Sequence, residues 1–257
     1  MRSSLLLLSG YFGAFLAEAK PSFPPSNYLS PPLSPLLSRR PMSGHLMRRD
    51  VNPNQPEYYG PSQTALLFLD YQNVLINMIT DQGERSNLIN SAKQLLATAR
   101  KNRVAIIHCL IDTDINPPRT SKIYEQWFTI NKPALEAMPE LAEEYSEFAP
   151  TCNSTSRYET ISWRLPGPRS AFVNKDLLPL LRNELGVTSL ILGGIATSGA
   201  VMGTALQGMD EDFVVTVVED AVWDPNPQIH RDLLDVVFPV LGYVVSTAEA
   251  VGYMEKK

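Results

Sequence analysis

Asp70 and a glycine-flanked turn at residues 193–199 are the two features of this sequence whose residue types and positions favour chemistry. Asp70 directly follows the apolar run 65–69, which is typical of a strand buried on both faces. In the partly desolvated crevice at such a strand end, the pKa of a carboxyl group can rise enough for acid or base work. The glycine turn precedes a helical pattern whose free N–H groups can face a carbonyl oxygen or an anion. A helix cap for Asp70 and a purely conformational role for the glycines are the alternatives.

The segments around these features alternate between strand and helix patterns. Apolar runs predict strands at residues 65–69, 104–107, 160–163, 187–192, 213–218 and 243–245. Apolar residues at helical spacing predict helices at residues 86–101, 133–144, 175–185, 197–209 and 228–237. This order predicts an α/β fold, a doubly wound three-layer sandwich with a central, mostly parallel sheet. Ligands bind beyond the carboxyl ends of the strands in such a sheet, where Asp70 and the glycine turn fall.

A long polar interval, residues 112–160, precedes the third strand and is where substrate loops are expected. It contains Trp127 and Phe128, which can form an apolar wall for a substrate ring or, alternatively, a packed aromatic pair. His108 falls inside a strand pattern, which favours a satisfied core histidine. The segment 223–225 favours a turn rather than a site.

Four short motifs follow one another in an order and spacing that are specific when taken together. They are Asp70-Tyr71-Gln72-Asn73, Arg169-Ser170-Ala171-Phe172, the turn from Gly194 to Val201, and Glu219-Asp220-Ala221. The set resembles the isochorismatase-like hydrolases, a family that includes nicotinamidases, carbamoylsarcosine amidohydrolases and isochorismatases. The resemblance covers Thr64 to about Glu249 and implies the isochorismatase-like hydrolase fold.

In most of that family an aspartate after the first strand, a lysine ahead of the Ser-x-Phe segment and a cysteine in the glycine turn form a catalytic triad. The resemblance places Asp70 at the first of these positions and Ala200 at the nucleophile position. Either Arg164 or Arg169 lies where the lysine is expected. An arginine keeps the positive charge without donating a proton, and a methyl group cannot attack a carbonyl. Ser198 lies two residues before the nucleophile position and is expected to point elsewhere.

The resemblance also implies a function that does not need the cysteine. Isochorismatases hydrolyse a vinyl ether without it, by protonation and addition of water. We therefore expect acid-catalysed hydrolysis of a small carboxylated or cyclic metabolite, with Asp70 as the acid and Arg164 as the supporting charge. A cis peptide bond between Ile195 and Ala196 is implied as well. The residues expected to bind substrate are Gln72, Asn73, Trp127, Arg169, Phe172, Ile195, Ala196, Thr197 and Ser198.

Two other functions remain open at this point. Two replaced triad positions favour a noncatalytic member of the fold that binds a metabolite or a partner protein. A conventional amidase is opposed by Ala200 and by the absence of metal-binding histidines, since His45, His108 and His230 have no ligand spacing. We expect no cofactor and no metal. Oligomers are common in the family, so a homo-oligomer is also expected.

Charge further narrows the class of partner. Residues 64–257 hold 16 Lys and Arg against 24 Asp and Glu, and such an acidic domain is a poor nucleic-acid binder. A small-molecule substrate is the expected partner. Cys109 and Cys152 have neither a disulfide framework nor metal-site spacing, so they decide no compartment.

The first 63 residues differ in composition from the rest. Arg2, the apolar stretch 5–16 and the Ala17-Glu18-Ala19 pattern predict a signal peptide over residues 1–19, hence secretion and no membrane anchor after cleavage. If translation instead starts at Met42 or Met47, a cytoplasmic protein is expected. Residues 20–63 contain ten of the 21 prolines and predict a disordered linker, which leaves residues 64–257 as the folded domain.

Overall fold

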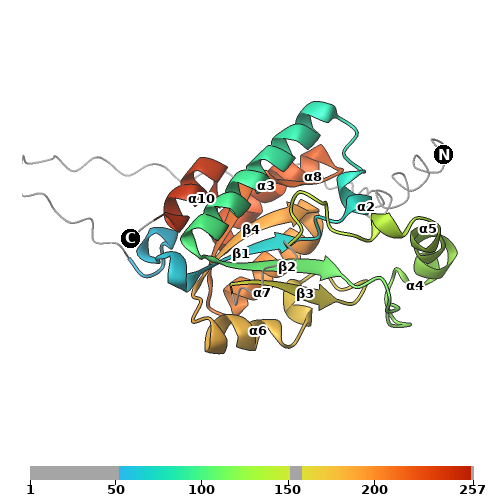
Figure 1. Ribbon diagram of the computed structural model, residues 1–257, viewed down its shortest axis with the longest axis horizontal. Coiled ribbons are helices and arrows are strands. Elements are labelled where there is room, and N and C mark those ends of the chain that lie inside the picture. Colours follow the sequence, from blue (N-terminus) through green and yellow to red (C-terminus); the bar gives the residue numbers. More distant parts are fainter. Residues whose placement is uncertain (1–51, 151–157, 256–257) are drawn as a thin grey trace, which may run out of the picture.

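The computed structural model describes residues 52–150 and 158–255, so the expected signal peptide and most of the expected linker lie outside the described residues. Six parallel strands form one sheet in the order β3–β2–β1–β4–β5–β6 (Figure 1). The strands are β1 Thr64–Leu69, β2 Ala105–Ile111, β3 Glu159–Arg164, β4 Ser189–Ile195, β5 Val214–Trp223 and β6 Tyr243–Val245. The strand order reverses between β1 and β4, and a crevice opens at such a switch point in doubly wound sheets.

Helices cover both faces of this sheet, as the predicted sandwich requires (Figure 1). One face packs against α3 (Gln82–Asn102) and α10 (Thr247–Met254). The other packs against α6 (Leu177–Pro179), α7 (Met202–Asp210), α8 (Pro227–Asp232) and α9 (Phe238–Leu241). Each face therefore has its own apolar core, and the central strands β1, β2 and β4 are buried on both sides.

The long helix α3 illustrates how sequence specifies these elements. Its buried residues Leu88, Ala92, Leu95 and Ala99 recur at helical spacing and form the stripe that contacts the sheet. The side chain of Asp81 caps its start by accepting a hydrogen bond from the Glu84 backbone N–H. The predicted helix at 86–101 is therefore present and begins one turn earlier.

The helical region of the polar interval differs from the predicted helix at 133–144. It consists of α4 (Tyr124–Gln126), a π-helical segment at residues 127–131 and α5 (Lys132–Ala137). The helix ends before Pro139 because a proline disfavours helical geometry in the residue that precedes it. Another short helix, α2 (Asn73–Ile76), follows the Asp70 motif.

Two differences occur near the C-terminus. Strand β5 continues to Trp223, past the predicted end at residue 218, because a register shift against β4 lets pairing resume after the irregularity. Asp220 consequently lies within the strand and accepts hydrogen bonds from the backbone N–H and hydroxyl of Thr247. Helix α10 was not among the predicted helices, and it starts with a capping box formed by Ser246 and Glu249.

Residues 52–63, which composition assigned to the linker, pack against the domain in the described structure. Pro56 and Tyr59 are buried, and the Tyr59 hydroxyl donates to the Pro53 carbonyl over 2.6 Å. The Tyr243 hydroxyl of β6 donates to the Asn54 carbonyl over 2.8 Å. Prolines begin both short 3-10 turns here, where their missing N–H is not needed. This part of the Pro-rich segment thus belongs to the fold.

Candidate active site

Asp70 lies directly after β1, and its backbone adopts a left-handed conformation with φ of 55°. Its backbone N–H donates to the Cys109 carbonyl of the neighbouring strand over 2.8 Å, which fixes the turn. The side chain is buried, and its Oδ2 forms an ion pair with Arg164. Its Oδ1 is also buried but has no hydrogen-bond partner among the described residues. The carboxyl group therefore has one satisfied and one unsatisfied oxygen.

Arg164 ends β3 and brings its guanidinium to Asp70 from two strands away. Its side chain is only 4% exposed, and its Nη1 donates to the Pro168 carbonyl over 2.6 Å. The two contacts use different arms of the guanidinium, so the arginine head is held on both sides. Of the two arginines that the sequence left open, Arg164 is the one that forms an ion pair with Asp70.

Burial and the two arginines act on the Asp70 carboxyl group in opposite directions. Desolvation raises its pKa, whereas the ion pair with Arg164 and the charge of Arg169 lower it. The net effect is a pKa raised from the ordinary value, because removal from water outweighs the two positive charges. A proton on the unsatisfied Oδ1 would turn that oxygen into a donor.

The glycine turn after β4 approaches β1 closely. The peptide bond between Ile195 and Ala196 is cis, as the resemblance implied. Gly194 has φ of 155°, and a side chain there would overlap the Leu69 backbone, with a Cβ only 2.6 Å from that of Leu69. Glycine is thus required for the ends of β1 and β4 to meet. The same turn carries Ala200 in a π-helical segment, Thr197–Val201, that leads into α7.

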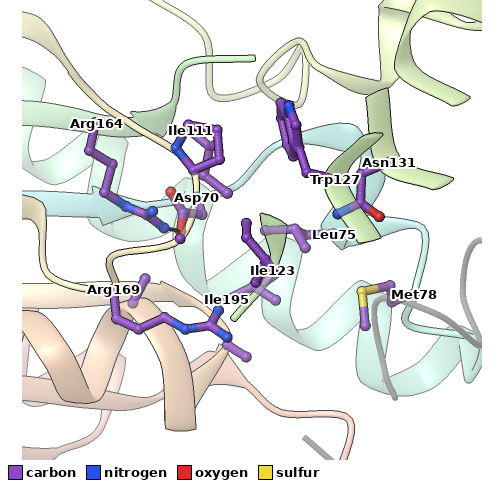
Figure 2. A pocket seen from close by; sticks show the side chains of 14 residues that line it. Asp70, Leu75, Met78, Ile111, Ile123, Trp127, Asn131, Arg164, Arg169 and Ile195 are labelled. Atoms are coloured by element: carbon purple, nitrogen blue, oxygen red, sulfur yellow. Dashed lines mark hydrogen bonds and ion pairs between the residues drawn. The ribbon is translucent and has the colours of Figure 1, made fainter. Parts of the chain in front are cut away.

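A cavity of about 90 Å³ lies where these elements meet (Figure 2). Asp70, Arg164 and Ala200 all line it, together with Arg169. One wall is apolar, and it comes from α2, the end of β2 and the region of α4. The complete lining is Asp70, Leu75, Met78, Ile111, Ile123, Trp127, Asn131, Arg164, Pro166, Gly167, Arg169, Ile195, Ala196 and Ala200.

Arg169 presents a second positive charge to the cavity (Figure 2). Its side chain crosses α7 and the glycine turn, with Nη1 3.6 Å from where a Cβ on Gly199 would lie. Burial, followed by the charge of Arg164, lowers the pKa of Arg169, while Asp70 raises it. An arginine remains protonated at ordinary pH, so this group can bind an anion beside Asp70.

Five of the residues expected to bind substrate do not line this cavity. The Gln72 side-chain amide instead donates to the carbonyls of Ile111 and Ala142 and accepts a hydrogen bond from the Ile111 backbone N–H. The Asn73 side-chain amide donates to the Glu140 carbonyl. Phe172 stacks against Phe213 in the core.

The other two of the five, Thr197 and Ser198, belong to the glycine turn and make their hydrogen bonds to residues that do not line the cavity. The Thr197 hydroxyl lies 2.8 Å from Nδ1 of His230, and the Ser198 backbone N–H donates to Asp224 over 2.8 Å. The Ser198 hydroxyl is buried and has no hydrogen-bond partner among the described residues. It does not reach the cavity, so the turn offers no alternative hydroxyl nucleophile there.

Cys109 is the cysteine within the described residues, and Cys152 lies outside them. The Cys109 thiol is fully buried on β2 and does not line the cavity. Burial, aided by the negative charge of Asp70, raises the pKa of this thiol, which keeps it protonated and unreactive.

Sequence reasoning missed most of the apolar wall and one polar group. Ile123, Trp127 and Asn131 recur every four residues and share one side of the helical region, and only Trp127 was predicted. That spacing was a usable signal. The sequence around Leu75 and Met78 shows no comparable spacing. Their position at the cavity depends on how α2 packs after Asp70, which the sequence pattern does not reveal.

Within residues 52–150 and 158–255, no three His, Cys, Asp or Glu side chains gather in the manner of a metal site. No helix in the same part of the chain is long and apolar enough to cross a membrane.

Comparison with known proteins places this geometry in a family. Residues 64–249 match the Isochorismatase domain. An uncharacterized isochorismatase family protein of Bacillus subtilis, YwoC, is 25% identical over 73% of this chain and 92% of its own. Maleamate amidohydrolase of Pseudomonas putida is 33% identical, but over only 32% of this chain and 38% of its own. A cysteine hydrolase structure from Pseudomonas syringae pv. phaseolicola superposes with a TM-score of 0.61 at 22% identity, covering 83% of this chain and 99% of that one. The chain therefore belongs to the isochorismatase family.

Proposed function

We propose that this domain is a hydrolase that works without a cysteine and uses Asp70 as the acid toward a small carboxylated substrate. The observation that carries the proposal is that Asp70 and Ala200 line the same cavity. Asp70 offers an unsatisfied, buried Oδ1, whereas Ala200 offers only a methyl group. Covalent catalysis needs a nucleophilic side chain, but acid catalysis with water as the attacking group does not.

Hydrolysis of a vinyl ether fits these groups step by step. The proton on Asp70 Oδ1 is transferred to the terminal alkene carbon, which forms a C–H bond and leaves an oxocarbenium ion. Water adds to the cationic carbon and returns a proton to the Asp70 carboxylate. In the resulting hemiketal the bond to the substrate's ether oxygen breaks, the hydroxyl proton passes to that leaving oxygen, and an alcohol and a ketone are formed. The acid is regenerated, and one water is consumed.

The two arginines have separate roles in this scheme. Arg164 is held by Asp70 and Pro168, so it fixes the carboxyl group and stabilises the anion that remains after proton transfer. Arg169 lines the same cavity, and its guanidinium is placed to pair with a substrate carboxylate. The partial similarity to a maleamate amidohydrolase, whose named substrate carries a carboxylate, supports an anionic substrate.

The cavity volume favours a small reacting end. An engineered cavity of about 150 Å³ binds benzene, so the roughly 90 Å³ here is better matched to a side arm than to a whole ring. The apolar wall around Trp127 would contact the planar part of the substrate and exclude water from the proton transfer. A larger ring would have to remain at the cavity mouth.

A noncatalytic, metabolite-binding function is the second candidate, and Ala200 also favours it. The same cavity, with Arg169 and the apolar wall, would bind a small anion without turning it over. Binding alone would not require a proton on Asp70, whereas acid catalysis would. The two functions therefore differ in whether the activity depends on the protonated Asp70 carboxyl group.

The test is turnover by the full chain of isochorismate and of a panel of small amides. Asp70→Asn is expected to abolish vinyl-ether hydrolysis, whereas Ser198→Ala, outside the cavity, is expected to leave it intact. The rate should fall as the pH rises above the raised pKa of Asp70, because the acid is then lost. If the folded chain turns over neither substrate class but binds small carboxylates, the second function replaces the first. Loss of activity in Ser198→Ala alone would instead identify a hydroxyl nucleophile.

A further inference from the structure

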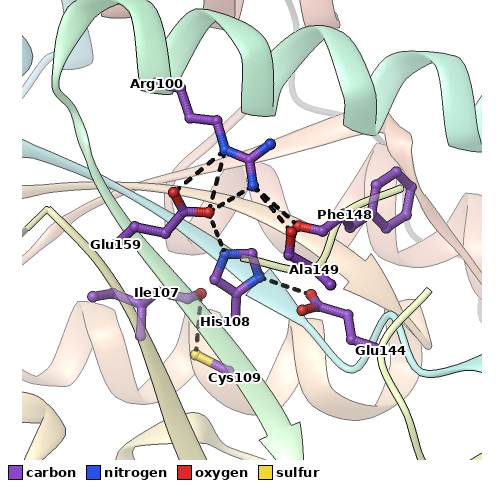
Figure 3. Close-up of polar contacts among 8 residues, drawn as sticks. All are labelled: Arg100, Ile107, His108, Cys109, Glu144, Phe148, Ala149 and Glu159. Carbon is purple, nitrogen blue, oxygen red and sulfur yellow. Dashed lines mark hydrogen bonds and ion pairs between the residues drawn. The ribbon is translucent and has the colours of Figure 1, made fainter. Parts of the chain in front are cut away.

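His108 lies at the centre of a buried set of charged side chains that the proposed reaction does not use (Figure 3). Its ring is fully buried on β2. Its Nδ1 lies 2.8 Å from Glu144 Oε1, and its Nε2 lies 3.1 Å from Glu159 Oε1. An ionised carboxylate only accepts hydrogen bonds, and a neutral imidazole has a single N–H. Two carboxylate contacts therefore require that both ring nitrogens carry a proton.

The charges around the ring balance only when it is protonated. Arg100 of α3 binds Glu159 through Nη2 over 2.7 Å, so the set holds two carboxylates, one guanidinium and one imidazolium. The Tyr71 hydroxyl donates to the Ala221 carbonyl, and burial, followed by the charges of Asp220 and Glu144, raises the pKa of its phenol, so it stays neutral. The remaining neighbours of the ring include the apolar side chain of Phe68.

Glu144 connects this set to the candidate active site. The segment 142–145 is bonded to residues 71–73, which directly follow Asp70. The Gln72 amide donates to the Ala142 carbonyl over 2.7 Å, and two backbone bonds of 2.8 Å join Asn73 to Glu143 and Tyr145 to Tyr71. Residues 71–73 lead into α2, which carries part of the apolar wall.

We propose that His108 is a positioning residue of this site: its ring holds Glu144 and so fixes segment 142–145 and, through it, residues 71–73, which connect Asp70 to α2. Its effect on catalysis rests on the proposed function, whereas the mechanical link does not. The ring touches neither the cavity nor Asp70, so it acts through Glu144.

The two carboxylates respond differently when the ring loses a proton. Glu159 keeps Arg100 as a second partner. Glu144 has no such replacement, because its Oε2 is buried without a hydrogen-bond partner among the described residues. A neutral ring keeps one N–H, and in the tautomer protonated at Nδ1 that N–H still binds Glu144, while Arg100 continues to bind Glu159. The contact between the ring and Glu159 is therefore the one given up, and the anchor of segment 142–145 depends on the ring itself.

The direction of the pH dependence follows from the same contacts. Burial lowers the pKa of His108, but the hydrogen bonds to Glu144 and Glu159 outweigh it, and the net pKa is raised. The bonds from His108 and Arg100 overcome the burial of Glu159 and lower its pKa to about 2. The contact to Glu159 is therefore held while His108 is protonated and is weakened as the pH rises through its raised pKa, whereas the ring N–H that faces Glu144 remains.

The experiment measures amide hydrogen exchange of the full chain from pH 6 to pH 10, corrected for intrinsic exchange, in the peptides that cover residues 70–76 and 139–149. NMR of the His108 ring follows its protonation in the same range. His108→Gln is expected to lower the protection of both peptides by about tenfold or more at every pH, as for loss of a charged hydrogen bond. The unmodified chain should keep the protection of both peptides as His108 titrates, because the neutral ring retains the N–H that binds Glu144. His230→Gln is the matched control, because that ring contacts Thr197 on the far side of the turn.

A rescue variant separates positioning from general destabilisation. His108→Gln combined with Glu144→Gln removes the uncompensated charge and allows an amide pair, so protection of both peptides should recover in part. Unchanged protection in His108→Gln, or a loss spread equally over α3 and β5, would overturn the proposal. These readouts do not use turnover, so they stand whether or not a substrate is found. In an active enzyme, KM should rise in His108→Gln and not in His230→Gln.

Discussion

Replacing Arg164 with Met tests the buried ion pair most directly. The side chains of Arg164 and Asp70 are 4% and 3% exposed, so water cannot replace the lost guanidinium. Met retains much of the stem volume but no charge. The Asp70 carboxyl group must then either remain ionised without its partner or take up a proton.

The cost has a constant part and a pH-dependent part. Loss of the bond to the Pro168 carbonyl, which becomes unsatisfied, costs about 1–3 kcal/mol at every pH. An unpaired buried charge costs about 3–5 kcal/mol, whereas protonating a carboxyl of ordinary pKa costs about 1.4 kcal/mol for each pH unit above about 3.9. Up to about pH 7 protonation is the cheaper choice, since it costs about 4 kcal/mol there. The folded variant thus binds a proton that the unfolded chain does not, so its stability falls as the pH rises.

Native Asp70 already has a raised pKa. This pKa sets the pH above which the stability difference between the native protein and Arg164→Met begins to grow. Below that pKa both proteins hold the proton and the penalty is flat. Above it the native protein is ionised and paired, and the penalty of Arg164→Met grows by about 1.4 kcal/mol per pH unit. Between pH 5 and pH 7 the increase is at most about 2.7 kcal/mol. The onset of the slope reports the native pKa of Asp70.

Urea unfolding at several pH values, with constant m-values, provides the measurement. The same substitution made in an Asp70→Asn background should show no slope, because no carboxyl group remains there. A penalty that stays constant from pH 5 to pH 9 would refute the reasoning. An equal slope in the Asp70→Asn background would do the same, since it would assign the titration to another group.

Two further substitutions probe the glycine turn. Gly194→Ala should destabilise the fold by about 2–5 kcal/mol, because the new Cβ would overlap the Leu69 backbone at a positive φ. Gly60→Ala, with open space around it, is the control, and similar unfolding midpoints for the two variants would contradict the close approach of β1 and β4. Ala200→Cys should place a thiol in the cavity that iodoacetamide alkylates faster than Cys109, whose buried thiol has a raised pKa. Peptide mass mapping measures both sites, and faster alkylation of Cys109 would argue against an accessible position 200.

The fold was predictable where one physical pattern decides the structure. The apolar run 65–69 can only be satisfied by burial on both faces, and β1 is buried throughout. Boundaries set by distant contacts were not predictable, such as the end of β5, which depends on its register with β4. For α10 the capping signal of Ser246 and Glu249 was present in the sequence and could have been used.

The candidate site was only partly predictable for a related reason. Arg164 ends a strand, and Asp70 and Ala200 follow strands, and all three strand ends must lie at the same sheet edge, so topology alone brings these residues together. The polar character of Gln72 and Thr197 led to a wrong prediction that they line the cavity. A polar side chain that binds a ligand and one that holds a loop in place cannot be told apart by residue type. Which of these applies is decided by neighbouring backbone groups, and those come from remote parts of the chain.

The packing of residues 52–63 determines where the chain can be cut without damage. Trypsin cleaves after Lys and Arg, and between Arg49 and Arg85 the sequence has no such residue. A tryptic fragment starting after Arg49 keeps the contacts of Asn54 and Tyr59, whereas a recombinant chain trimmed to the family match at residue 64 discards them. It would also leave the Tyr243 hydroxyl of the edge strand β6 without its acceptor. The natural boundary of the folding unit thus lies upstream of the one that family similarity marks.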